Sequence, residues 1–562
     1  MNRSTKIGLG IGGFIVLLIL AIVIAGFVVV RRPFPDTSGT ISLAGLQEPV
    51  EIYRDEFGIP HIYAQNEHDL FFAQGYTHAQ DRFWQMEFWR HISAGRISEI
   101  AGESTVESDM FIRTMGWNRI AEETLAYYEE NEPELMAIME AYAKGVNAYI
   151  DENQNNISMN YTVLGLVNDQ WEIEPWTPLH TVGWSIVMSD DLSGNWSDEV
   201  RRANLIKELG ESTVANLQPF YPYESRPVIA PTDQLTIDGE EAAILQEAIL
   251  NTAVNWENVS TNLIGSKPDL GYLGAEGFVG SNNWVIHGDH TPTGMPLLAN
   301  DPHLGIQMPS IWYEIGLHAP GYDVTGFSFA GTPGVIIGHN ENIAWGVTNV
   351  RPDIQDVYIE KINPSNPNQY EFEGEWLDME IIEEVIRVNG GEDVVLNVRL
   401  THHGPIISEV LDDATDMLSM RWTAHEPNKL LAAIVGLNRA GNYDDFRDAL
   451  RNWDVPSQNV VYADIEGNIA YQMPGLVPIR KDGNGLVPVP GWTGEYEWEG
   501  WIEYDELPAL FNPDQGYIVT ANHAVIDEEF PHLINLYWAD GNRGQRITDM
   551  IEAELNGDGT VS

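Results

Sequence analysis

The pattern of apolar residues changes once along the chain, and this change constrains the fold more than any other feature of the sequence. In the first half, apolar residues recur at helical spacing over residues 67–100, 120–150 and near 197–209. After Ser281, short runs of β-branched and aromatic residues are separated by Gly and Pro, as in strands, with one helix near residues 443–451. A mainly helical part followed by a mainly β part predicts a fold of the α+β class.

A stretch rich in Gly, Asn and Ser separates these two parts. It covers about residues 251–280 and shows no clear periodicity, which is typical of a linker. The expected organisation is an apolar segment over residues 1–32, a helical region over 33–250, the linker over 251–280 and a β-rich region over 281–562.

The N-terminal segment predicts a membrane anchor. Arg3 and Lys6 precede an uncharged apolar run over residues 7–30, which as a helix spans about 36 Å, enough for a hydrocarbon core of about 30 Å. The run is longer than the apolar region of a typical signal peptide. Val23-Ile24-Ala25 has the form of a cleavage site, so a cleaved signal is the alternative, but further apolar residues follow it before Arg31.

Charge and composition exclude several functions. The chain has 29 Lys and Arg residues against 84 Asp and Glu residues, a net charge of −55. Phosphate contacts need clustered Lys and Arg, so we exclude nucleic acid as a partner. The chain has no Cys, which excludes disulfides, thiolate metal sites and cysteine nucleophiles. Any nucleophile therefore carries oxygen or nitrogen.

The segment GFVGSNNWVIHGDH follows the linker and opens the β-rich region, whereas the G-x-S-x-G motif of a triad hydrolase is absent. Cleavage between Gly280 and Ser281 would give Ser281 both a hydroxyl nucleophile and a free α-amine. An α-amine has an ordinary pKa of about 7.7–8.0, so it can act as a base near neutral pH. Nucleophile and base would then lie on one residue.

Several segments together strongly resemble the penicillin acylase family. They include RDEFGIPHIYA, FFAQGYTHAQDRFWQMEFWR, GSNNWVI, NDPHL, PVPGW and YIVTANH, and they occur in order from about Val50 to Ile547. The resemblance implies the four-layer α/β/β/α sandwich of N-terminal-nucleophile hydrolases. It also implies an inactive precursor cut into an α chain and a β chain, and hydrolysis of amides. The helical region would then be the α chain, the linker a spacer propeptide and the β-rich region the catalytic β chain.

The resemblance assigns the reacting groups by position. Ser281 matches the nucleophile at the start of the β chain, and His303 in NDPHL matches the histidine that contacts this serine in part of the family. In WGVTN, Asn349 matches the residue whose backbone N–H enters the oxyanion hole.

Two further groups are assigned near the end of the matched region. Asn522 in TANH matches the side-chain donor of the oxyanion hole. Arg546 in GQRI matches the arginine near that asparagine, with Arg543 as the weaker candidate because of an insertion before Pro531.

The resemblance also implies a structural calcium ion that ties the two chains together. Asp353 and Asp356, the backbone carbonyl of Gln355, and Glu199 match its ligands, and carboxylates suit calcium. A further aspartate expected near Leu533 is missing. No organic cofactor is expected.

Two pairs of histidines have the form of transition-metal ligands. His287 and His290 lie in HGDH, and His402-His403 lie in THHGP. No third or fourth ligand occurs at a recognisable spacing, so we interpret both pairs as structural.

The acyl pocket of the family is expected to be lined here by Leu304 and Ile337, where penicillin G acylases carry two phenylalanines. This favours an aliphatic acyl group on a small N-acyl substrate, such as an acyl-homoserine lactone, with β-lactam side chains and lipopeptides also open.

Two alternatives to this acylase remain open: a catalytically inactive, membrane-tethered binding protein of the same fold, and a metallohydrolase that uses His287 and His290. Combined with the anchor and the missing cysteines, the resemblance predicts a location outside the cytoplasm. Family members continue beyond the QRI segment, whereas this chain ends at Ser562, so we expect a fragment rather than a shortened protein.

Overall fold

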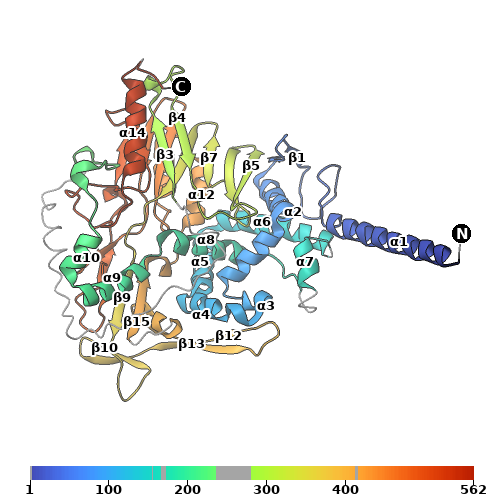
Figure 1. Ribbon diagram of the computed structural model, residues 1–562. Coiled ribbons are helices and arrows are strands. Elements are labelled where there is room, and N and C mark those ends of the chain that lie inside the picture. The colour runs from blue at the N-terminus through green and yellow to red at the C-terminus, as the bar shows by residue number, and fades with distance from the viewer. Residues whose placement is uncertain are drawn as a thin grey trace.

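The structure is a computed structural model that describes residues 3–154, 156–165, 172–235, 280–411, 416–557 and 559–561. The predicted linker lies outside these residues except for Gly280. The molecule combines helices and sheets, as predicted (Figure 1). The described α-helices are α1 (Arg3–Arg31), α2 (Glu67–Ser93), α3 (Ser98–Ala101), α4 (Val106–Met115), α5 (Trp117–Asn131), α6 (Pro133–Asn153), α7 (Met159–Leu164), α8 (Pro178–Ser193), α9 (Trp196–Leu209), α10 (Glu211–Leu217), α12 (Leu430–Arg439), α13 (Tyr443–Leu450) and α14 (Asn542–Leu555).

Helix α1 extends away from the rest of the molecule (Figure 1). Residues 11–31 of this helix have a mean hydropathy of 3.3 over their most apolar stretch, and none of that stretch is buried. Among the described residues, α1 is the one helix long and apolar enough to cross a membrane. A signal sequence meets the same criterion, so both interpretations of the N-terminus are compatible with this helix.

The predicted helices of the first half are confirmed, and α2 and α6 pack closely against each other. Helix α2 begins after Asn66, whose side-chain oxygen accepts the backbone N–H of Asp69 at 2.9 Å and so caps the first turn. Gly75 on α2 faces the backbone of Tyr142, and Gly145 on α6 faces the backbone of Phe72. A side chain at either glycine would collide with the opposite helix.

The largest sheet has nine described strands. Its strands are all antiparallel to their neighbours except for the parallel pair β2 and β5. Their order across the sheet is β1 (Glu51–Arg54), β2 (Pro60–Tyr63), β5 (Trp312–Ala319), β6 (Tyr322–Phe329), β7 (Ile337–Asn340), β8 (Ile343–Asn349), β16 (Gln458–Asp464), β17 (Ile469–Gln472) and β21 (Ala509–Phe511). Strands from both halves of the chain therefore form one sheet.

A second sheet carries the residue that follows Ser281. Its order is β22 (Tyr517–Thr520), β3 (Asn282–Ile286) and β4 (Leu297–Asp301). Strands β3 and β4 contact β8 and β16 of the large sheet, and the side chain of Asn300 on β4 exchanges two hydrogen bonds of 2.8 and 2.9 Å with the backbone of Val347 on β8. Helix α14 contacts β22 and β3, while α2 and α12 contact the large sheet (Figure 1).

The remaining strands form smaller sheets. These are β9 (Gln355–Glu360) with β15 (Met417–Trp422) and β19 (Val489–Pro490), β12 (Glu380–Ile386) with β13 (Val394–Thr401) and β14 (Gly404–Pro405), β10 (Gln369–Phe372) with β11 (Glu375–Asp378), and β18 (Pro478–Arg480) with β20 (Trp498–Trp501). The largest apolar cluster contains residues from both halves, and Trp89 stacks on Trp184 within it at 3.9 Å. The helical and β-rich parts therefore share a core.

Candidate active site

Ser281 lies immediately before β3 and is only 3% exposed. Its backbone nitrogen donates to Asn522 Oδ1 at 2.8 Å, and its carbonyl accepts Arg543 Nη1 at 2.6 Å. Cleavage of the Gly280–Ser281 bond would convert this nitrogen to an α-amine. The amine would therefore form next to a side-chain oxygen, Asn522 Oδ1, which already accepts a hydrogen bond from the same nitrogen before cleavage.

Asn522 follows β22 and adopts a left-handed backbone conformation with φ of 63°. Asparagine tolerates this conformation better than most residues because its short polar side chain bonds locally. Its Oδ1 also accepts Arg543 Nη2 at 2.8 Å, and its Nδ2 donates to the carbonyl of Asn349 at 2.9 Å. These partners fix the orientation of the amide. Since a side-chain amide has two N–H groups, the second can donate to a ligand.

His303 borders the bond that the sequence predicts to be cut. Its Nδ1 lies 3.1 Å from Asp301 Oδ2 and 3.1 Å from the carbonyl of the same residue. With Nδ1 donating, Nε2 carries the free lone pair. A Cβ atom at Gly280 would lie only 2.8 Å from this Nε2, so the glycine allows close approach. Sequence reasoning did not single out Asp301, although it lies in the NDPHL segment.

The arginine beside Asn522 is Arg543, not Arg546. Arg543 lies in the first turn of α14 and also donates to Asn282 Oδ1 at 2.8 Å. Arg546 lies one turn further from the site and is exposed, which corrects the preference made from sequence. Burial lowers the pKa of Arg543, which still remains charged near neutral pH, and lowers that of the neighbouring His523 to about 4. His523 is therefore neutral at pH 7, and Arg543 supplies the positive charge next to Asn522.

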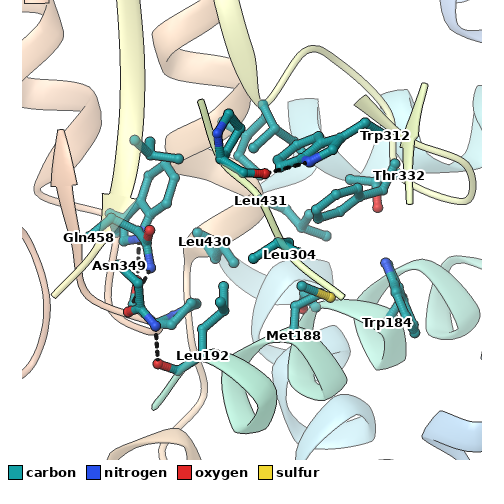
Figure 2. A pocket seen from close by; sticks show the side chains of 18 of the residues that line it. Trp184, Met188, Leu192, Leu304, Trp312, Thr332, Asn349, Leu430, Leu431 and Gln458 are labelled. Carbon is teal, nitrogen blue, oxygen red and sulfur yellow. Dashed lines mark hydrogen bonds between the residues drawn. The ribbon is translucent and has the colours of Figure 1, made fainter. Parts of the chain in front are cut away.

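An apolar cavity adjoins Ser281 (Figure 2). Its walls come from α8, from strands of the large sheet, from α12 and from the segment after α13. The lining residues are Trp184, Ser185, Met188, Leu192, Ser281, Pro302, Leu304, Trp312, Phe329, Thr332, Ile336, Val347, Asn349, Leu430, Leu431, Ile434, Trp453, Pro456 and Gln458. The side chain of Asn349 donates to the carbonyl of Leu192 at 2.6 Å and accepts from Gln458 at 3.4 Å and from the backbone N–H of Arg351 at 3.2 Å.

The structure places one of the two predicted pocket residues in this cavity. Leu304 lines it, and its contact with an acyl group stays a prediction. Ile337 does not line it. The preceding residue, Ile336, does, whereas Ile337 begins β7 and pairs with Phe327 on β6. Successive side chains on extended backbone point to opposite sides, so a shift of one residue accounts for the error.

The four residues predicted to bind calcium lie near one another, but their geometry does not fit the ion. The guanidinium of Arg480 donates to Asp356 at 2.7 and 2.8 Å and to Asp353 Oδ1 at 3.2 Å. The side chain of Gln355 accepts two backbone N–H groups, although the predicted ligand is its backbone carbonyl, and Glu199 Oε2 accepts the N–H of Val357. Among the described residues, these carboxylates do not form a group whose oxygens converge within 4.8 Å.

The buried guanidinium of Arg480 therefore lies between Asp353 and Asp356. The side chain of Arg480 is 5% exposed, and those of Asp353 and Asp356 are 7% and 6% exposed. Burial and the neighbouring aspartates raise the pKa of Glu199 well above its usual range. In this arrangement Arg480 neutralises the two aspartates. Calcium binding by these residues stays a prediction, and no step of the proposed reaction depends on it.

The first histidine pair is structural in this arrangement. His287 Nδ1 accepts the backbone N–H of Asp289 at 3.1 Å and so caps the short helical turn Gly288–His290. Among the described residues, no group of three possible ligands includes His287 or His290. This geometry gives no support to a metallohydrolase built on that pair.

Comparison with known proteins identifies the family. The family model described as penicillin amidase matches residues 49–561, and the chain belongs to this family. Acyl-homoserine lactone acylase QuiP of Pseudomonas aeruginosa is 31% identical over 538 residues, which are 93% of this chain and 61% of that protein. Penicillin G acylase of Escherichia coli is 28% identical over 554 residues, 90% of this chain and 62% of that protein.

A solved structure is also similar. The thermostable penicillin G acylase from Alcaligenes faecalis is 33% identical over 48% of this chain and 49% of that chain, with a TM-score of 0.44. The chain spans a little over 60% of the length of the two curated relatives.

Proposed function

We propose that this protein hydrolyses the amide bond of a small N-acyl substrate through an acyl-enzyme on Ser281. The observation that carries the proposal is the position of Ser281. Its nitrogen donates a hydrogen bond to Asn522 Oδ1, which also accepts one from Arg543. Ser281 adjoins an apolar cavity, and Gly280 before it lies beside the ring of His303. The relatives named as acylases support the same chemistry.

Processing would come first and would use the same hydroxyl. Ser281 Oγ attacks the carbonyl carbon of Gly280, and the C–N bond to Ser281 breaks as the nitrogen gains a proton. The resulting ester between Gly280 and Ser281 Oγ is hydrolysed by water, which leaves a carboxylate on Gly280 and a free α-amine on Ser281. His303 Nε2 lies beside Gly280 and is placed to move a proton in this step.

Hydrolysis of the substrate would then use the new amine as the base. The amine takes the proton of Ser281 Oγ, the oxygen attacks the substrate carbonyl, and the amine returns a proton to the leaving nitrogen. The oxyanion would accept the second N–H of Asn522 Nδ2 and the backbone N–H of Asn349. Water then cleaves the acyl ester. Arg543, bonded to Asn522 Oδ1, holds the amide in place.

We also propose the four-layer arrangement and the division into two chains that the family implies. The α chain would lie within residues 33–250, the spacer within 251–280 and the β chain from 281 onward. The contact between the two sheets, with α14 on one side and α2 and α12 on the other, supports this arrangement.

The cavity favours substrates with an aliphatic acyl group, as in acyl-homoserine lactones, over substrates with a phenylacetyl group. Its lining is almost entirely apolar and includes the unbranched or aliphatic side chains of Leu304, Ile336 and Met188, which suit contact with an alkyl chain. Such contacts contribute about 1–3 kcal/mol per group, or roughly 10–200-fold in selectivity.

A panel of N-acyl compounds tests the function. We expect kcat/KM for acyl-homoserine lactones with medium-length chains to exceed that for a phenylacetyl amide by at least about tenfold. Release of the free amine is the measurement, with Ser281→Ala protein as the blank. Equal or better cleavage of the phenylacetyl compound would contradict the interpretation of the cavity, and no cleavage of any compound would contradict the function.

We propose further that α1 anchors the protein in a membrane, with the catalytic part outside the cytoplasm. The uncharged, unburied surface of α1 over residues 11–30 supports an anchor, since lipid would cover it. Protease added to intact cells should degrade the protein from Pro33 onward. Degradation only after membrane disruption would place the catalytic part in the cytoplasm, and release of the intact protein from the membrane by high salt would argue against an anchor.

A further inference from the structure

We propose that His402, His403 and Glu497 form a binding site for a divalent transition metal ion of the zinc class. The two histidines lie in the turn between β13 and β14, and Glu497 directly precedes β20. None of the three lines the cavity at Ser281. Sequence spacing offered no third ligand for this histidine pair, but the fold brings Glu497 to it from nearly a hundred residues away.

The three ligand atoms lie at distances close to those that a zinc ion requires. His403 Nε2 lies 3.0 Å from Glu497 Oε1, His402 Nε2 lies 3.7 Å from the same oxygen, and one ligand atom from each residue lies within 4.8 Å of the others. Zinc binds nitrogen and oxygen at about 2.0–2.2 Å in a tetrahedron, so its ligands lie about 3.3–3.5 Å apart. The observed separations lie on either side of this value, so an ion needs only small side-chain shifts.

Hydrogen bonds behind the ligands orient both rings. His403 Nδ1 lies 2.8 Å from Glu360 Oε1, and that oxygen also accepts the hydroxyls of Thr401 and Ser419 at 2.9 and 2.6 Å. A carboxylate on the far nitrogen of a histidine is the usual support of a metal ligand, because it fixes the ring and directs Nε2 toward the ion. His402 Nδ1 in turn lies 3.1 Å from the hydroxyl of Tyr370.

Access and charge fit a small cation. His403 is buried, but the side chain of His402 is 31% exposed. Both line a cavity that is open to solvent, from which an ion can enter. Arg421 approaches Oε2 of Glu497 at 3.8 Å and leaves Oε1 for the ion. Two carboxylates, Glu360 and Glu497, contact the one imidazole ring of His403, so a divalent ion would offset their charge.

The donor set selects among metals. Two imidazoles and one carboxylate, with no thiolate, suit zinc, nickel and copper better than calcium or magnesium. Three protein ligands leave a fourth position, which in zinc sites holds water or a ligand.

The test is zinc binding by the purified protein after chelation and removal of the chelator. We expect one zinc ion per chain by calorimetry and by elemental analysis. Cobalt(II) at the same stoichiometry should give the visible absorption of a four-coordinate nitrogen and oxygen site. His402→Ala and Glu497→Gln should each abolish stoichiometric binding, and Glu360→Gln, which removes only the supporting carboxylate, should weaken it by about 10–100-fold.

His532→Ala is the matched control, because His532 is a partly exposed histidine paired with Glu506 at 3.2 Å outside this cluster. It should bind zinc like the unaltered protein. Circular dichroism separates loss of binding from loss of folding, and the exposed His402 keeps the test informative if Glu497→Gln does not fold. Absence of stoichiometric zinc in the unaltered protein, or undiminished binding by His402→Ala, would overturn the proposal. Acylase activity is not the readout, so the outcome is independent of the proposed function.

Discussion

Ser281→Ala is expected to leave the chain uncut and without acylase activity. The side chain of Ser281 supplies the only oxygen that both steps use, first against the carbonyl of Gly280 and then against the substrate. Without that oxygen the α-amine never forms, so nucleophile and base are lost together. Ser281→Thr keeps the hydroxyl but adds a β-methyl that restricts χ1, so it should process slowly and hydrolyse poorly.

Intact-mass analysis with N-terminal sequencing measures this outcome. The unaltered protein should yield a fragment that begins at Ser281, whereas Ser281→Ala should persist as one chain. Ser365→Ala, at an exposed serine in a loop, is the control and should process normally. An active Ser281→Ala protein with a new N-terminus elsewhere would refute the central proposal. An unaltered protein that stays uncut and inactive would favour the tethered binding protein instead.

Local patterns in the sequence predicted the elements of the fold well. The helical spacing over residues 67–100 becomes α2 and α3, and the apolar run at the N-terminus becomes α1. Such patterns depend on which face of a helix or strand is buried, and this information is local. The position of Ser281 at the start of a strand was predictable for the same reason.

Errors occurred where one turn or one residue decides which side chain faces the site. Arg543 and Arg546 are three residues apart on α14, and only the position of the helix start places the first beside Asn522. Ile336 and Ile337 are adjacent, and the register of β7 decides which one meets the cavity. Neither the helix start nor the strand register follows from residue types alone.

Contacts between distant segments could not be predicted from local patterns, and only the resemblance to the penicillin acylase family brought Ser281, Asn349 and Asn522 together. Arg480 lies more than a hundred residues after Asp353 and Asp356, and nothing in its surroundings in the sequence indicates that it enters the expected calcium site. The sequence also did not indicate that α8 and α12 line the cavity. An apolar helix face has the same residue pattern whether it packs against the core or lines a ligand site.

Asn522→Ala is expected to lower kcat by about 10²–10³-fold, which corresponds to about 2.7–4 kcal/mol of lost transition-state stabilisation. The amide of Asn522 is held by Ser281, Arg543 and Asn349, so its free N–H points in a fixed direction before the substrate arrives. A donor that needs no reorganisation stabilises the oxyanion more than water does. KM should change little, because the uncharged substrate carbonyl gains much less from this donor than the oxyanion does.

The left-handed backbone of Asn522 complicates a single substitution, and a pair of variants resolves it. Alanine at a φ of 63° is strained by roughly 1–2 kcal/mol, whereas glycine adopts this conformation freely. Asn522→Gly therefore removes the amide without the strain. If the amide acts on the oxyanion, both variants should lose kcat to a similar extent once chains with a free Ser281 amine are compared. A loss of less than threefold in Asn522→Gly, with processing intact, would assign the effect in Asn522→Ala to backbone strain and remove Asn522 from the oxyanion hole.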